Sequence, residues 1–221
     1  MAYKTILFDL DGTLLDTLED LADAVNHILE RHRCPQRTLD EVRLFVGNGL
    51  GMLMRRALPA QYSQMVSDLL AEELRTYYTA HSRIKTEAYP GMRELLEELH
   101  TAGAKVAVVS NKADEAVEEL CRCYFPGLVD AAVGETPGRR PKPAPDAVDL
   151  ALERLGANRD GAVYVGDSQV DLDTARTAGL PCIAVTWGFR ARQDLMKAGA
   201  ETLADTPAQL LELLRGDGPA R

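Results

Sequence analysis

Several short apolar runs in this chain end abruptly at polar residues. They are KTILF at 4–8, AKVAVV at 104–109, GAVYVG at 161–166 and PCIAVT at 181–186, with a weaker run, LVDAAVG, at 128–134. The runs are nearly continuous in apolar residues and do not alternate with polar ones. Such runs are typical of strands that are buried on both faces of a parallel sheet. The sequence therefore predicts an open parallel sheet.

Segments with helical periodicity lie between these runs. They are GMRELLEELHTAG at 91–103, DEAVEELCRCY at 114–124, PDAVDLALERLG at 145–156 and DLDTARTAG at 171–179. Strands that alternate with helices indicate an α/β fold in which helices cover the sheet. The fold class expected from this pattern is α/β, with a Rossmann-like open parallel sheet and helices on both of its faces.

One long interval breaks the alternation, because it contains helical segments only. These segments are LEDLADAVNHILERH, GLGMLMRRAL and QMVSDLLAEELRTYYTAHS, and turn signals separate them at Pro35, Gly47-Asn48-Gly49 and Pro59. An all-helical block inserted after the first strand indicates a separate cap domain. We predict a Rossmann-like core at 1–16 and 85–221 and a helical cap at 17–84. The tail RGDGPAR is expected to be frayed.

Charge and composition argue against several classes of partner. The 221 residues carry a formal net charge of −9, which disfavours nucleic acid or an anionic membrane as a partner. No apolar run approaches the length of a membrane span, and Asp9 and Asp11 cut the N-terminal apolar stretch too short for a signal peptide. The four cysteines match no zinc or redox spacing, which favours reduced, mostly buried thiols in a cytoplasmic protein.

Polar residues gather where the predicted strands end. In an open α/β sheet, ligands bind outside the carboxyl ends of the strands. Here those ends carry Asp9 and Asp11, then Ser110, Asn111 and Lys112, then Asp167, Ser168 and Asp171. The segment GRRPKPAPD at 138–146 adds Lys142, and its prolines stiffen the loop because they fix φ. We therefore expect acids, a hydroxyl and lysine side chains to meet at one edge of the sheet.

The spacing of Asp9 and Asp11 needs a physical reason, because repulsion and desolvation both oppose two carboxylates beside a buried strand. A divalent cation offsets both effects, and oxygen ligands combined with a substrate phosphate suit Mg²⁺. One aspartate can be a nucleophile that forms an aspartyl-phosphate, and the other can donate and accept protons. Ser110 and Lys142 are typical phosphate holders, and Gly12 leaves room for backbone N–H groups near an anion.

Two predicted helix starts carry further expectations. Asp16-Thr17-Leu18-Glu19 fits a capping box, so Asp16 is expected to cap a helix and not to catalyse. The Gly47-Asn48-Gly49 turn precedes the helical segment LGMLMRRAL, whose N-terminal N–H groups and dipole favour an anion. If the cap closes over the substrate, Gly49 and Arg56 are candidates for contact with its non-phosphate end.

The motifs together resemble the haloacid dehalogenase superfamily, specifically its phosphoglycolate phosphatase-like branch. FDLDGTLLDT, VVSNK, RPKPAPD and YVGDSQVD resemble the four motifs of that superfamily, and the segments FVGNGLGMLMRRAL and VTWGF resemble the branch. The resemblance covers essentially the whole chain. It implies a Rossmann-like core with a helical cap inserted after the first strand, and a phosphatase activity.

The resemblance also implies a role for each motif residue. Asp9 would be the nucleophile and Asp11 the general acid and base. Mg²⁺ would be bound by the side chains of Asp9 and Asp167 and by the backbone carbonyl of Asp11. Asp171 would lie in the second coordination shell of the metal or support its waters. The phosphate would be held by Gly12, Ser110, Asn111 and Lys142. The implied partner is a small phosphorylated metabolite, with 2-phosphoglycolate as the leading candidate, and the chain is expected to be a monomer or homodimer.

Sister functions are weighed on particular residues. Haloacid dehalogenases lack the second aspartate of the first motif, and Asp11 is present here. Phosphonatases place a Schiff-base lysine in the cap, and residues 17–84 contain none. β-Phosphoglucomutases carry a histidine early in the cap, and EDLADAV has none. Pyrophosphatase, nucleotidase and sugar-phosphate phosphatase or mutase activities stay open. A non-enzymatic phospho-acceptor remains the alternative from a different class, although the complete acid set favours an enzyme.

Overall fold

The computed structural model describes residues 1–216; residues 217–221, most of the tail expected to be frayed, lie outside the described residues. The chain divides into two compact units. One consists of Met1–Leu15 and Ala88–Arg221, and the other of Asp16–Glu87. The chain passes between the units at β2 (Leu15–Asp16) and β3 (Glu87–Ala88), which pair in a two-stranded sheet.

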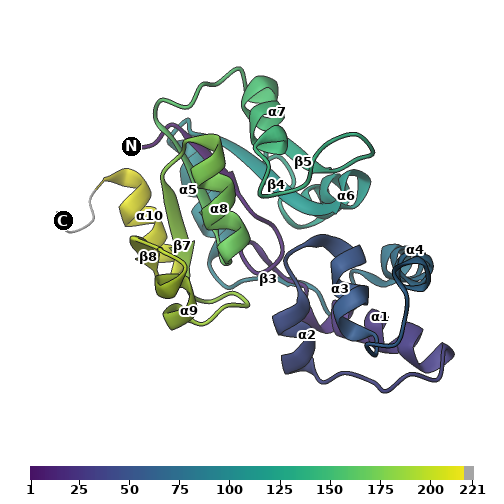
Figure 1. The fold of residues 1–221 in the computed structure, drawn as a ribbon. Coiled ribbons are helices and arrows are strands. Elements are labelled where there is room, and N and C mark those ends of the chain that lie inside the picture. The colour runs from purple at the N-terminus through teal and green to yellow at the C-terminus, as the bar shows by residue number, and fades with distance from the viewer. Residues whose placement is uncertain (217–221) are drawn as a thin grey trace. The chain divides into compact units, whose positions relative to one another are not determined.

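The first unit contains a six-stranded parallel sheet with the strand order β5-β4-β1-β6-β7-β8 (Figure 1). The strands are β1 (Thr5–Phe8), β4 (Lys105–Ala113), β5 (Ala131–Glu135), β6 (Ala162–Gly166), β7 (Cys182–Val185) and β8 (Thr202–Ala204). Phe8 at the end of β1 lies opposite Val108 on β4 and Val165 on β6. Residues 9, 109 and 166, which come next on β1, β4 and β6, therefore lie at one level of the sheet, and β4 continues beyond it to Ala113.

Helices cover both faces of the sheet, as the continuous apolar runs predicted (Figure 1). Ile6 and Phe8 pack into one buried cluster with α5 (Met92–Thr101), α6 (Asp114–Tyr124) and α10 (Pro207–Arg215). Leu7 points to the opposite face and packs with α7 (Asp146–Leu155) and α8 (Gln169–Ala178). The predicted fold class, a Rossmann-like α/β sheet, is confirmed.

Some elements of this unit were not predicted. The strand β8 has three residues, too few for a periodic pattern, and pairs in parallel with β7. The helices α9 (Arg192–Lys197) and α10 were also missed. The predicted helices at 91–103, 114–124, 145–156 and 171–179 correspond to α5, α6, α7 and α8, although α8 begins at Gln169.

The second unit is helical and contains α1 (Leu18–Arg31), α2 (Leu39–Phe45), α3 (Gly49–Ala57) and α4 (Gln64–His81). The helix α2 was not predicted, although its capping box, in which Thr38 and Glu41 bond each other's backbone N–H, is visible as T-L-D-E in the sequence. Buried Asp20 accepts hydrogen bonds from the backbone N–H groups of Ile84 and Thr86, which ties the end of this unit to α1.

The predicted capping box at Asp16 was wrong in its position. The helix α1 has Thr17 as its N-cap residue, so it begins one residue later than a box of Asp16 and Glu19 requires. Asp16 still accepts a hydrogen bond from the N–H of Leu18, at 3.2 Å. Its side chain therefore supports the start of the helix from outside the helix.

Two expectations drawn from composition can be compared with the structure. Within residues 1–216, every helix is too short or too polar to cross a membrane. Of the four cysteines, Cys34 and Cys121 are buried, Cys182 is partly covered and Cys123 is exposed. The expectation of mostly buried thiols is therefore half right.

Candidate active site

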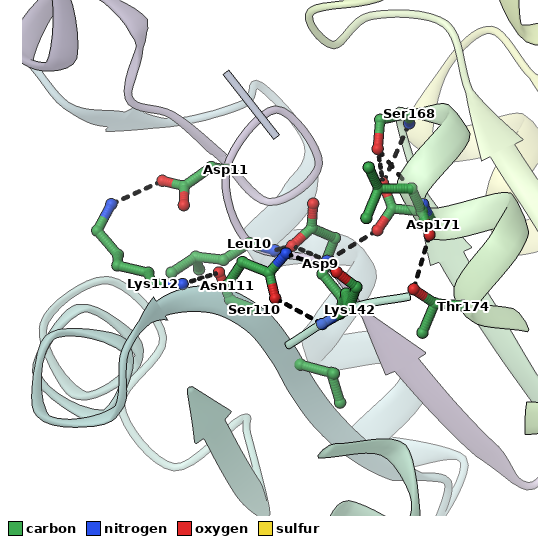
Figure 2. Close-up of polar contacts among 12 residues, drawn as sticks. Asp9, Leu10, Asp11, Ser110, Asn111, Lys112, Lys142, Ser168, Asp171 and Thr174 are labelled. Carbon is green, nitrogen blue, oxygen red and sulfur yellow. Dashed lines mark hydrogen bonds and ion pairs between the residues drawn. The ribbon is translucent and has the colours of Figure 1, made fainter. Parts of the chain in front are cut away.

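The sheet register brings the predicted site residues together within the first unit. Asp9 follows β1, Asp167 follows β6, and Ser110, Asn111 and Lys112 lie in the last part of β4. Because β1 lies between β4 and β6, these residues share one edge of the sheet, and Figure 2 shows Ser110 and Asn111 near Asp9 and the Lys112 side chain reaching Asp11. The loop before α7 adds Lys142, and the first turn of α8 adds Asp171.

Asp9 is buried and held at two points. Its Oδ1 accepts a hydrogen bond from the N–H of Leu10 at 2.7 Å. The same oxygen lies 2.8 Å from the Lys142 Nζ. These contacts fix the carboxylate at the end of β1, where a bound phosphate would lie if Asp9 is its acceptor.

Lys142 is the buried cation of the site, with a side chain only 3% exposed. Its Nζ lies 2.8 Å from both Asp9 Oδ1 and Asp171 Oδ1 and donates to the Tyr164 hydroxyl at 3.1 Å. Burial opposes the charge, but the carboxylates of Asp171 and Asp9 together raise the pKa of Lys142 well above its ordinary value. Lys142 therefore stays charged at any physiological pH.

The side chain of Asn111 holds the loop that carries this lysine. Its Oδ1 accepts from the backbone N–H of Lys142 at 2.8 Å, and its Nδ2 donates to the Lys142 carbonyl at 3.2 Å. Direct binding of phosphate by Asn111 stays a prediction. What the structure adds is a positioning contact that the sequence did not reveal.

Asp9, Asp167 and Asp171 form a buried acid cluster, in which one oxygen of each carboxylate lies within 4.8 Å of those of the other two. Burial first, and then the charge of Asp171, raise the pKa of Asp9 well above its ordinary value. The same two causes raise the pKa of Asp167 from 3.8 to about 7. When all three carboxyl groups are ionised, they face one ammonium and leave an excess of negative charge, which a divalent cation would neutralise.

Asp171 uses both of its oxygens within the protein. Oδ1 contacts Lys142, and Oδ2 accepts from the Ser168 N–H at 3.1 Å and from its hydroxyl at 2.6 Å. Ser168 and Asp171 form the capping box of α8. These contacts suit a residue that orients the groups around it and does not itself bind the metal directly. A role of Asp171 in metal binding stays a prediction.

The side chain of Asp167 is held in place by backbone segments that pack closely around it. The Phe189 N–H donates to its Oδ2 at 2.6 Å. A Cβ on Gly12 would lie 2.5 Å from this oxygen, and one on Gly188 would lie 2.4 Å from the Asp167 Cβ. Both positions therefore require glycine, and Gly12 also has a φ of 87°.

The prediction for Gly12 rested on a different reason. Its own N–H donates to the Leu15 carbonyl at 2.8 Å inside the turn that follows β1. In this structure the glycine makes room for Asp167 and for the turn, and a direct contact between Gly12 and phosphate stays a prediction.

Asp11 lies apart from the acid cluster. Its Oδ1 is 2.7 Å from the Nζ of Lys112, whose side chain is 5% exposed. Figure 2 shows the Asp11 carboxylate turned toward Lys112 and away from Asp9. The sequence predicted that Lys112 lies at this strand end, but it did not indicate which side chain Lys112 contacts. Ser110 is buried nearby, and its Oγ accepts from the Lys112 N–H at 3.2 Å.

The two cap candidates belong to the helical unit. Arg56 donates to the Phe45 carbonyl at 2.7 Å and to Asn48 Oδ1 at 2.8 Å, so its guanidinium closes the turn before α3. Gly49 is the first residue of α3 and has a φ of 78°. Within this unit, Arg56 is therefore committed to the turn, and substrate contact by either residue stays a prediction.

The chain is similar to several known proteins. Residues 6–185 match the haloacid dehalogenase-like hydrolase family. The phosphoglycolate phosphatase of Vibrio parahaemolyticus is 33% identical over 225 residues, with 96% of each chain covered. That of Pseudomonas syringae pv. syringae is 34% identical over 223 residues, which cover 96% of this chain and 77% of the relative.

A solved structure of a protein from Lactobacillus delbrueckii subsp. bulgaricus, assigned as a phosphoglycolate phosphatase, is also similar. It has a TM-score of 0.92 and 37% identity, over 97% of this chain and 99% of the other. The chain belongs to the haloacid dehalogenase-like hydrolase family. Its enzyme class is that of a phosphoric monoester hydrolase, so its substrate is a small phosphorylated molecule.

Proposed function

We propose that this chain is a Mg²⁺-dependent phosphatase that hydrolyses 2-phosphoglycolate through an aspartyl-phosphate on Asp9. The observation that carries the proposal is the buried acid cluster beside one buried lysine, which together suit a divalent cation and a phosphate. The choice of 2-phosphoglycolate rests on relatives of that name that match nearly the whole of this chain.

In the proposed reaction, Asp9 attacks the phosphorus atom and the bond to the leaving oxygen breaks. Asp11 gives its proton to that oxygen, and then accepts a proton from the water that hydrolyses the aspartyl-phosphate. Lys142 and Ser110 hold the phosphate oxygens. The side chains of Asp9 and Asp167 and the backbone carbonyl of Asp11 would hold Mg²⁺, which supplies positive charge to the transferring phosphoryl group.

We further propose that residues 17–84 act as a cap that selects the substrate, as Gly49 and Arg56 at the turn before α3 would allow. The proposed location is the cytoplasm, because buried reduced cysteines such as Cys34 and Cys121 suit a reducing compartment. A monomer or homodimer is the proposed assembly.

The test is release of phosphate from a panel of compounds with Mg²⁺ and with a chelator. The panel contains 2-phosphoglycolate, pyrophosphate, a nucleoside monophosphate and a sugar phosphate. We expect the highest kcat/KM for 2-phosphoglycolate and no activity without the metal. Asp9→Asn should remove roughly 10³-fold or more of the turnover, since the covalent nucleophile is lost. A higher kcat/KM for another member would replace the proposed substrate, and turnover by Asp9→Asn near that of the parent would refute the mechanism.

A further inference from the structure

Lys112 is a buried cation outside the acid cluster. Its side chain is 5% exposed, and its Nζ lies 2.7 Å from Asp11 Oδ1, whose side chain is 17% exposed. Burying an ammonium group is costly unless a charged partner lies close to it. Lys142 already provides a cation beside Asp9. A need for positive charge at the phosphate therefore does not by itself explain a second buried lysine, Lys112, on β4.

The backbone of Lys112 is placed with little freedom. The pairing of β4 with β5 shifts register between Val109 and Ala113, so Lys112 lies in an irregular part of the strand. Gly134 on β5 packs so closely that a Cβ there would lie 2.5 Å from the Lys112 carbonyl oxygen. The Lys112 N–H donates to Ser110 Oγ. These contacts restrict the backbone position from which the Lys112 side chain extends.

Asp11 is also fixed at its backbone, by the turn that follows β1. Leu14 and Leu15 donate to the Leu10 carbonyl, and the Gly12 N–H donates to the Leu15 carbonyl. The remaining freedom of Asp11 lies in its side-chain torsions. Lys112 restrains them by holding one carboxylate oxygen (Figure 2).

We propose that Lys112 is a positioning residue for proton transfer by Asp11. The inference rests on the proposed function, in which Asp11 protonates the leaving oxygen. With Oδ1 held by Lys112, the plane of the carboxyl group is set, and with it the direction of the second oxygen. The first step starts with Asp11 protonated on its second oxygen while Oδ1 accepts the hydrogen bond from Lys112. That proton passes to the leaving alkoxide oxygen, and the carboxylate left behind forms an ion pair with the Lys112 ammonium. In the second step that carboxylate takes a proton from the attacking water, and Lys112 keeps its own proton throughout.

The competing explanation is a structural ion pair that only ties the turn after β1 to β4. The two explanations differ in how the effect depends on the leaving group. An alkoxide must be protonated as it departs, whereas p-nitrophenolate departs without a proton. Loss of a purely structural pair would disturb both reactions alike.

The experiment measures formation of the phosphoenzyme in a single turnover, by rapid quench, with 2-phosphoglycolate and with p-nitrophenyl phosphate. Lys112→Met should slow the reaction of 2-phosphoglycolate by about 10²-fold, in line with the usual size of general acid catalysis, and that of the aryl ester by less than about threefold. Lys112→Arg should recover much of the loss. Lys105→Met is the matched control, because Lys105 lies on the same strand and donates to the Leu155 carbonyl; it should change neither rate.

A double variant keeps the test decisive if Lys112→Met loses stability. Asp11→Asn combined with Lys112→Met should be no slower with 2-phosphoglycolate than Asp11→Asn alone, because both changes affect the same step. Equal slowing of the two substrates, no slowing of either, or additive losses in the double variant would overturn the role of Lys112. A parent enzyme that forms no phosphoenzyme from either ester would instead refute the proposed function.

Discussion

Raising the pH should destabilise the metal-free protein in the range where Asp167 titrates. Burial and the charge of Asp171 raise the pKa of Asp167 from 3.8 to about 7, although the Phe189 N–H and Arg190 lower it. Between these two values the folded chain holds a proton that the unfolded chain has released. The free energy of unfolding therefore falls as the pH rises through this window.

The size of the effect follows from the same pKa. A rise from 3.8 to about 7 corresponds to on the order of 4 kcal/mol of stability lost across the window. For a chain of this length, that loss is roughly 8–16 °C in Tm. Bound Mg²⁺ requires the ionised carboxylate, so stabilisation by Mg²⁺ should grow as the pH rises from 5 to 7.5.

Thermal unfolding at several pH values, in chelator and in excess Mg²⁺, checks this expectation. Asp167→Asn is the control, because it keeps the side-chain volume and removes the titrating group. In chelator at pH 7.5 the variant should be more stable than the parent, and its Tm should fall less steeply with pH. If parent and variant show the same pH dependence in chelator, Asp167 does not have a raised pKa and the reasoning fails.

Two further substitutions test the residues that hold Asp167 and Lys142 in position. Gly12→Ala should raise the Mg²⁺ concentration needed for half-maximal activity, since the new Cβ displaces Asp167; Gly103→Ala, with a similar positive φ in open space, should leave it unchanged. Asn111→Ala should raise KM for every phosphorylated substrate together and cost roughly 1–3 kcal/mol in unfolding free energy, because the buried backbone of Lys142 loses both contacts. A change in kcat alone would contradict this account of Asn111.

The fold could be predicted from the sequence as far as its elements carry a repeating pattern. Continuous apolar runs gave the parallel strands, and helical periodicity gave the helices between them. The strand β8 is too short for such a pattern, and only its pairing with β7 defines it. The helix α2 has seven residues, but its Thr38–Glu41 capping box was a signal that could have found it.

The site was predictable to the level of which residues meet, because strand ends in a parallel sheet share one edge. Asp9, Asp167 and Asp171 were placed in this way, and the structure brings their carboxylates together. The pairing of side chains could not be predicted in the same way. Lys112, which contacts Asp11, lies where the pairing of β4 with β5 is irregular, and spacing alone does not reveal either feature.

Glycines explain why the acid cluster can be both buried and ordered. A Cβ on Gly166 would lie 2.3 Å from the Cβ of Asp171, and one on Gly188 would lie 2.3 Å from the Gly12 carbonyl oxygen. Neither Gly166 nor Gly188 has a positive φ, so crowding alone excludes a side chain there. Glycine at these positions therefore lets the end of β6 and the segment after β7 approach Asp167 and Asp171 more closely than a residue with a side chain would allow. The carboxylates are held close together by this packing, and the repulsion between their ionised forms is the physical reason why the proposed site would take up a cation.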